Sequence, residues 1–330
     1  MRSWPVAWDD EQGLNARLWT PRVKSLVTQL AARLSYRESV DLLSETLGFE
    51  IEDSSADEVV QEVGGRLRAQ QTALVSGDER GVITPLVTTP PRHLYVGMDG
   101  TTAHIGGDWH EVKIGVVYEG QPGEDGLDTV HHARYVAIQE TSEPFGDRLY
   151  ALAAQAGVEL AGATVVIGDG AQWIWNAAGQ HYPRAIQIVD YWHACEHIHA
   201  LGRAYYGEGS PQGQRWARAH CRALKSQGPG KLLRALARLS AKPGEQKQAV
   251  EREQGYFRRN RRRMEYGQFR VAGLMIGSGP VEAACKVVVG QRLKGAGMRW
   301  STAGADAVLA ARAALLSGDT HLIAQAARAA

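Results

Sequence analysis

Apolar residues in the first part of the chain recur at helical spacing. Across residues 21–75 they return every three or four positions, as on one face of a helix. Gly48 closes one stripe, and residues 53–55 offer N-caps for a following helix over 56–67. This succession predicts an N-terminal helical region with a helix-turn-helix outline. The second helix is acidic, which is poor chemistry for phosphate contact, so DNA contact and plain packing both stay open for it.

Beyond a proline-rich linker at 82–92 the apolar period shortens to that of strands. The expected elements are strands at 94–98, 112–118 and 135–138, a helix at 145–156, strands at 164–167 and 185–189, and a helix at 191–205. A further helical segment separates the last two strands. Three meandering strands followed by alternating helices and strands predict an α/β fold, a mixed sheet with helices on both faces. This is the element order of the ribonuclease H-like core.

A basic helical segment interrupts the α/β pattern. Residues 207–272 read as helices, and an arginine-rich run ends them. The chain has a formal net charge of +1, yet residues 211–300 carry 20 basic against 5 acidic side chains. This asymmetry indicates a polyanionic partner, although a basic surface without a partner is the alternative. We therefore expect four regions: 1–92 (helical), 93–206 (first part of the core), 207–272 (insertion) and 273–330 (second part of the core).

Composition narrows the class of protein. A 330-residue chain with 44% hydrophobic residues can form a sizeable core. We find no apolar run of the ~18 residues that a membrane span requires, and no signal peptide. Three scattered cysteines do not make a disulfide framework, so a cytoplasmic protein without a membrane partner is expected.

Three carboxylates are the leading candidates for chemistry. Asp99 and Asp169 each end an expected strand beside glycine, and Glu282 lies on an expected helix after the insertion. If the two strands are parallel neighbours, both aspartates lie at the carboxyl edge of the sheet, where such folds bind ligands. Oxygen donors of this kind suit Mg²⁺, with Mn²⁺ as a substitute, and can form a two-metal site for phosphodiester chemistry. The alternative is that the Asp-Gly pairs are turn residues.

A histidine-rich helix is the second candidate. His193, Glu196 and His197 fit the H-x-x-E-H pattern of some zinc peptidases, with Glu282 as an available third ligand. The plain alternative is a histidine-rich helix capped by Asp190. Three tryptophans lie nearby in the sequence: Trp173, Trp175 and Trp192. They could stack on nucleobases, although core packing is expected for at least two of them.

Taken together, these residues resemble the DDE transposases of bacterial insertion sequences, in particular the ISKra-type group, related to Mutator-like transposases. The segments that carry the resemblance are LYVGMDGT (94–101), WHEVKIG (109–115), GDGAQWIW (168–175), DYWHACEH (190–197), GSGPVEAACK (277–286) and GMRWS (297–301). Each segment alone is weak, but six in the same order are specific. The resemblance covers about residues 20 to 318.

The resemblance implies a ribonuclease H-like catalytic domain with a helical insertion. It implies that Asp99, Asp169 and Glu282 are the catalytic and metal-binding triad, and that Asp190 and His193 support it as the D-x-x-H signature. It also implies double-stranded DNA partners, both transposon ends and target, and an assembly of at least a dimer. Such transposases usually carry a longer N-terminal region, so part of a DNA-binding region is expected to be missing.

Three functional hypotheses follow. The first is a Mg²⁺-dependent DNA transposase whose insertion binds the DNA backbone through arginines. The second is a zinc metallopeptidase that uses His193, Glu196 and His197. The third is a catalytically inactive DNA-binding remnant of a mobile element. The arginines expected to bind DNA are Arg258, Arg259, Arg261, Arg262 and Arg263.

Overall fold

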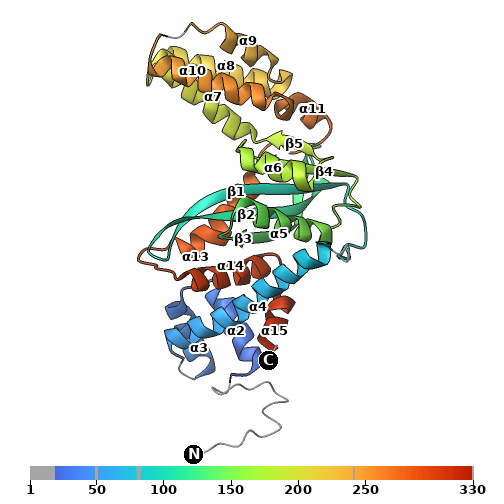
Figure 1. Cartoon of the computed structure of the whole chain (residues 1–330), viewed down its shortest axis with the longest axis vertical. Helices are drawn as coiled ribbons and strands as arrows, with labels where there is room; N and C mark the ends of the chain where they lie inside the picture. The colour runs from blue at the N-terminus through green and yellow to red at the C-terminus, as the bar shows by residue number, and fades with distance from the viewer. Residues whose placement is uncertain (1–18, 49–50, 80–82, 241, 329–330) are drawn as a thin grey trace, which may run out of the picture.

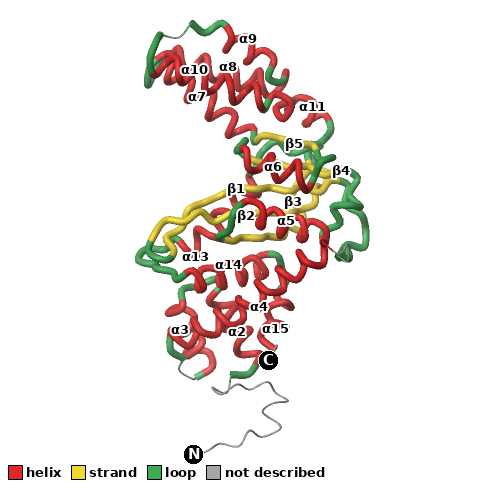
Figure 2. Tube along the Cα trace, viewed as in Figure 1, coloured by secondary structure: helices red, strands yellow, loops and turns green. Residues whose placement is uncertain are grey.

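The structure, a computed structural model, describes residues 19–48, 51–79, 83–240 and 242–328. A central sheet lies between two groups of helices (Figures 1 and 2). One group is a lobe formed by α7 to α11, and the other contains α2 to α4 with α14 and α15. The strands are β1 (His93–Ile105), β2 (Asp108–Pro122), β3 (Asp128–Ile138), β4 (Ala163–Gly168) and β5 (Ile186–Val189).

Helices make up most of the rest of the described chain. Before and within the sheet they are α2 (Pro21–Ala31), α3 (Tyr36–Leu47), α4 (Asp53–Glu79), α5 (Ser142–Gln155) and α6 (Gln172–His181). The lobe contains α7 (Tyr191–Tyr206), α8 (Pro211–Gln227), α9 (Gly230–Ala237), α10 (Glu245–Arg259), the 3₁₀ turn η1 (Arg261–Met264) and α11 (Tyr266–Val271). After it come α12 (Gly279–Ala284), the π-helical turn η2 (Cys285–Gly290), α13 (Gln291–Leu293), α14 (Thr302–Leu316) and α15 (Thr320–Arg328).

The five strands form one mixed sheet in the order β3-β2-β1-β4-β5. β1, β2 and β3 form an antiparallel meander, while β4 and β5 run parallel to β1. The predicted α/β class, mixed sheet and N-terminal helices are thus confirmed. The strand order is consistent with ribonuclease H-like topology.

The first strand is longer than its apolar run predicts. Asp99 does not end the strand but lies inside it, because β1 continues to Ile105 in a hairpin with β2. The polar residues Thr101 and Thr102 interrupt the apolar run, so the sequence does not show this second half of the strand. Ala103 and Ile105 are nevertheless both buried, as alternate residues of a strand are. The pairing of β1 with the parallel strand β4, by contrast, ends at Gly97 and Ile167. Asp99 therefore lies just past the parallel part of the sheet.

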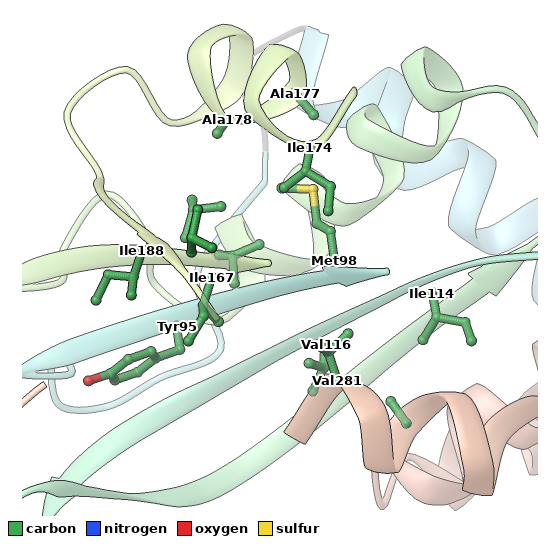
Figure 3. Packing of buried hydrophobic residues seen from close by; sticks show 14 of the residues in the cluster. Tyr95, Met98, Ile114, Val116, Ile167, Ile174, Ala177, Ala178, Ile188 and Val281 are labelled. Carbon is green, nitrogen blue, oxygen red and sulfur yellow. The ribbon is translucent and has the colours of Figure 1, made fainter. Parts of the chain in front are cut away.

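Helices cover both faces of the sheet. On one face Ile174 of α6 packs beside Met98 (Figure 3). On the same face Leu149 of α5 fills the space over Gly115. On the other face Val281 of α12 meets Val116 and the bare backbone of Gly97, where a Cβ would lie 2.9 Å from Val116. Because side chains alternate along a strand, Asp99 faces the same side as Gly97. Asp99 thus lies on the face that α12 covers.

The N-terminal helices pack against the C-terminal ones. Val27, Leu43 and Val63 share one apolar cluster with Ala310 and Ile323 of α14 and α15. Helices α2, α3 and α4 therefore share this core with α14 and α15. The helix predicted over 56–67 is part of the 27-residue α4, and its apolar side is buried in this cluster.

The acidic side of α4 is used within the protein. Glu62 forms an ion pair with Lys24 at 2.7 Å and another with Arg66 at 2.9 Å. These contacts favour the packing interpretation of this helix over DNA contact. In the part of the chain that the structure describes, no helix is both long and apolar enough to span a membrane.

Candidate functional site

Asp99 and Asp169 lie next to each other at the end of the parallel part of the sheet. Each lies two residues beyond the last β1–β4 pair, Gly97 with Ile167. Neighbouring strands run ~4.8 Å apart, so equal positions on them are side by side and point to the same face. The two strand ends thus bring together two carboxylates that the sequence separates widely.

Backbone amides hold one oxygen of each aspartate. Oδ1 of Asp99 accepts a hydrogen bond from the Gly100 amide at 2.7 Å, and Oδ1 of Asp169 accepts one from the Ala171 amide at 2.8 Å. The other oxygen of Asp99, Oδ2, accepts one from the thiol of Cys285 at 3.4 Å. Both carboxylates are therefore oriented by the protein itself.

The electrostatics at Asp99 favour a neutralising partner. Burial raises the pKa of the Asp99 carboxyl above its usual value, and the charge of Asp169 raises it further. Hydrogen bonds from Gly100 and Cys285 and the nearby His193 act in the opposite direction. Burial and the charge of Asp99 also raise the pKa of Cys285, so its thiol stays protonated at neutral pH and can donate.

Glu282 comes from the helix that covers this face. It lies on α12, exposed, three residues before Cys285, so the two share one side of the helix. Its charge contributes to the raised pKa of Cys285, which places it in the surroundings of the thiol that binds Asp99. At Cys285 the helix widens into the π-helical turn η2, a feature often found at functional sites.

The loop before α12 is fastened to the sheet. The Met275 amide donates to the Tyr95 hydroxyl at 3.0 Å, and that hydroxyl donates to the buried carboxylate of Asp128 at 2.6 Å. The Asp128 amide donates to the Gly273 carbonyl at 2.8 Å. These contacts fix the approach of α12, and hence of Glu282, to the strands. Nothing in the sequence pattern marks Tyr95 or Asp128 for this role.

Asp190 connects the third strand end to the same loop. It directly follows the last β4–β5 pair, Gly168 with Val189, so it lies in line with Asp169. Its carboxylate is buried, with 1% of the residue exposed, and accepts hydrogen bonds from the backbone amides of His193, at 2.6 Å, and Ser278. Both oxygens are thus engaged by amides. Asp190 caps α7 and holds the loop that leads to Glu282.

His193 meets Asp190 through its backbone and not through its ring. Its backbone amide donates to Oδ1 of Asp190. The imidazole Nδ1 lies 3.3 Å from Glu196 Oε2, and the ring packs edge-on against His197. The ring still lies close enough to the carboxylates for its charge to lower the pKa of Asp99.

Tyr256 connects the lobe to the site, a role that the sequence did not predict. On α10, the Tyr256 hydroxyl donates to the Asp169 carbonyl at 3.1 Å, and its ring fills the space that a Cβ at Gly170 would need. Gly170 has a φ of +104°, a backbone conformation that favours glycine. Tyr256 stacks on His197 at 3.9 Å between ring centres. Tyr256 and Gly170 are 86 positions apart, and a single sequence carries no pattern that links two residues at such a distance.

A buried carboxylate fixes His197 in turn. Nδ1 of His197 lies 2.7 Å from Oε2 of Glu253, whose side chain is 1% exposed. Burial raises the pKa of Glu253, but hydrogen bonds from His197 and Arg252 outweigh this effect and keep the pKa below its usual value. Because the ionised carboxylate can only accept, Nδ1 of His197 carries the proton. One ring nitrogen of His197 is therefore occupied by Glu253. The ring, fixed in this way, supports the Tyr256 ring that stacks on it.

The oxygen donors of the site suit a hard cation by their chemistry. Among the residues that the structure describes, no three His, Cys, Asp or Glu side chains lie close enough to hold one ion together. This applies to the three carboxylates and equally to the histidine set. Asp99 and Asp169 nevertheless fit a Mg²⁺ ion, because they are adjacent oxygen donors and burial raises the pKa of one of them.

The predicted DNA-binding arginines fall into two groups. Arg258, Arg259, Arg261 and Arg262 are exposed at the end of α10 and in η1. Arg263 instead donates to Gln187 of β5 at 2.7 Å and lies over the Trp175 ring at 4.3 Å. Burial lowers the pKa of its guanidinium. Arg263 thus connects the lobe to the edge of the sheet, while the other four face solvent.

In comparisons with known proteins, no family model and no curated protein matches this chain.

Proposed function

We propose that this protein is a DDE-type DNA transposase of an insertion sequence, with a ribonuclease H-like core and an α-helical insertion formed by the lobe. One observation carries the proposal: Asp99 and Asp169 occupy equivalent positions, each two residues past the last pair of the parallel strands β1 and β4. The packing of α12, which bears Glu282, on the same face supports it. The six sequence segments that resemble such transposases support it independently.

Asp99, Asp169 and Glu282 would share two Mg²⁺ or Mn²⁺ ions and would not bind one ion together. When bound, such ions activate a hydroxyl nucleophile and stabilise the oxygen that leaves phosphorus. The amides of Gly100 and Ala171 keep the aspartates oriented, and the Cys285 thiol occupies Oδ2 of Asp99. Asp190 holds the loop that leads to Glu282. The chain's own residues thus orient the carboxylates toward a scissile phosphodiester.

The lobe would supply the DNA contacts. Its four exposed arginines are suited to phosphate oxygens, and Tyr256 connects the same helix to the loop of Asp169. Double-stranded DNA, as transposon ends and as target, is the proposed partner. Cutting two ends would require at least a dimer.

The zinc-peptidase hypothesis lacks a comparable arrangement. Tyr256 covers one face of the His197 ring, and Glu196, the base of that hypothesis, is exposed and lies 3.3 Å from Nδ1 of His193. We therefore do not propose this activity.

Nicking of supercoiled plasmid DNA tests the proposed function. The wild type should nick DNA with Mg²⁺ or Mn²⁺ and should not with EDTA. Glu196→Gln should nick at nearly the wild-type rate. Stoichiometric zinc, with peptide cleavage that is lost in Glu196→Gln, would instead support the peptidase. DNA binding without nicking in any divalent metal would indicate the inactive remnant.

A further inference from the structure

An exposed tryptophan lies beside the proposed catalytic site. Of the three tryptophans near the strand ends, Trp175 is buried and Trp173 is half-buried against Phe145 and Lys113. Trp192 is different: it is 62% exposed, although α7 buries its neighbours Tyr191 and Ala194. The indole contacts Tyr191 and Lys225 but leaves most of its surface open, so its ring is available to stack on a ligand.

Trp192 borders the loop that leads to Glu282. It comes two residues after Asp190, and a Cβ on Gly277 would lie 3.6 Å from its indole ring. Gly277 directly precedes Ser278, whose amide binds Asp190. A group stacked on Trp192 would therefore lie beside Asp190 and the loop that leads to Glu282.

A cavity of about 500 Å³ opens at Trp192, between α7 and α8. The rings of Tyr191 and Trp192 and the two cysteines Cys195 and Cys221 give it an apolar wall. Its size falls within the range of small-ligand sites and accommodates a planar heterocycle.

The rim of the cavity is basic. Arg203, Arg218 and Arg222 line it together with His199, and Glu196 is the single acidic residue among the described residues that line it. Lys225 lies 5.3 Å from the ring centre of Tyr191 and 5.9 Å from that of Trp192. Glu196 is itself 3.3 Å from the Nδ1 atom of His193. The net charge of the rim therefore favours an anionic ligand with an aromatic part.

We propose that this cavity binds an unpaired nucleobase of the DNA substrate, stacked on Trp192, with the flanking phosphates bound by Arg218, Arg222 and Lys225. The inference rests on the proposed function in that the ligand is DNA held at the catalytic carboxylates. Stacking on an aromatic side chain tolerates any base, while the cations hold the backbone.

Fluorescence titration tests this inference. The probes are two duplexes that carry 2-aminopurine, one with the base paired and one with it unpaired in a one-nucleotide bulge. Both are titrated in Ca²⁺ buffer, which supports binding without strand cleavage. The wild type should quench the unpaired probe and bind that duplex more tightly. Trp192→Ala should lose roughly 5- to 150-fold in affinity for the unpaired duplex alone, and Trp192→Phe should lose less.

Trp109 provides the matched control. It is 65% exposed in the β1–β2 hairpin, away from α7, so Trp109→Ala should keep the preference for the unpaired base. Equal binding of both duplexes by the wild type, or an unchanged preference in Trp192→Ala, would overturn the inference. Cleavage of the paired duplex in Mg²⁺ is scored separately. Its absence, with the base preference intact, would contradict the proposed catalysis and leave the nucleobase site standing.

Discussion

The hydroxyl of Tyr256 donates a hydrogen bond to the backbone carbonyl of Asp169 at 3.1 Å, across 87 positions of the chain. Burial raises the pKa of this phenol, so it remains a donor throughout the working pH range. The contact connects the helical lobe, with its exposed arginines, to one of the two strand-end aspartates. If the lobe binds DNA as proposed, this contact would hold that DNA in register with the carboxylates.

Removing the hydrogen bond between Tyr256 and Asp169 should reduce metal-dependent DNA cleavage and leave DNA affinity unchanged. Tyr256→Phe keeps the ring over Gly170 but leaves the Asp169 carbonyl without its donor. We expect cleavage to fall about 10- to 100-fold, as for other groups that orient metal ligands, and the Mg²⁺ concentration for half-maximal rate to rise. Rates measured across Mg²⁺ concentrations, beside the DNA dissociation constant, check this. A lower rate with unchanged Mg²⁺ dependence would show that Tyr256 does not orient the site.

Asp190 should matter for both stability and activity. Asp190→Ala leaves the amides of His193 and Ser278 without acceptors, and a buried orphan donor costs about 1–3 kcal/mol. We expect a clearly lower free energy of unfolding and loss of cleavage, because the loop before Glu282 loses its anchor.

Ser210→Ala is the control for Asp190. Ser210 caps α8 through a single bond to the Gly213 amide, and its loss should cost about 1 kcal/mol without affecting cleavage. Chemical denaturation and cleavage assays of both variants make the comparison. If the two variants affected cleavage equally, Asp190 would have no role in the site beyond capping α7.

The ionised carboxylate of Asp99 should lower the free energy of unfolding at neutral pH when no metal is bound. Its pKa is raised in the folded state, so the folded protein favours the protonated form, and stability falls as pH rises through the folded-state pKa. Asp99→Asn should therefore be more stable than the wild type at pH 7, because the variant buries no charge at this position.

This advantage should shrink as pH falls toward the usual aspartate range, where the wild-type carboxyl is protonated too. Thermal unfolding in EDTA from pH 4 to pH 8 measures it. A stability difference that grows toward low pH would contradict the raised pKa.

The arginines of the lobe should separate into two functional groups. Replacing Arg258, Arg259, Arg261 and Arg262 with Gln should flatten the slope of log K against log salt by up to ~0.9 for each phosphate that is no longer neutralised. Arg263→Gln should leave the slope unchanged and lower the free energy of unfolding, because Arg263 binds Gln187 and covers Trp175. Binding isotherms at several salt concentrations distinguish the two groups. An Arg263 variant that changes the slope would return this residue to the DNA-contacting group.

The order of elements could be predicted from the sequence because each element carries its own apolar period. The predicted helix over 191–205 and α7 differ by one residue at one end. The full length of β1 could not be predicted, because the threonines after Asp99 interrupt the apolar run. Pairing with β2 extends the strand past them. The strand-end aspartates were identifiable from Asp-Gly motifs that follow apolar residues.

The side-chain contacts of the site could not be predicted in the same way. Asp190 and His193 belong to one sequence signature, but which atom of His193 meets Asp190 depends on the helix cap that they form. Arg263 looks like its neighbours in the arginine run, and only the edge strand β5 distinguishes it. The contacts of Tyr256 and Asp128 join segments far apart in the chain, where local pattern carries no information.

The central claim is that Asp99, Asp169 and Glu282 act together in metal-dependent DNA cleavage. The most direct test is cleavage of an end-labelled DNA duplex in Mn²⁺ by the wild type and by Asp99→Asn, Asp169→Asn and Glu282→Gln, with DNA binding measured on the same samples. We predict that the wild type cleaves, and that each variant loses cleavage by about 10³-fold or more, since each removes a ligand from the catalytic ions. DNA affinity should stay within about threefold of the wild type. A variant that binds DNA and still cleaves within tenfold of the wild-type rate would contradict the account.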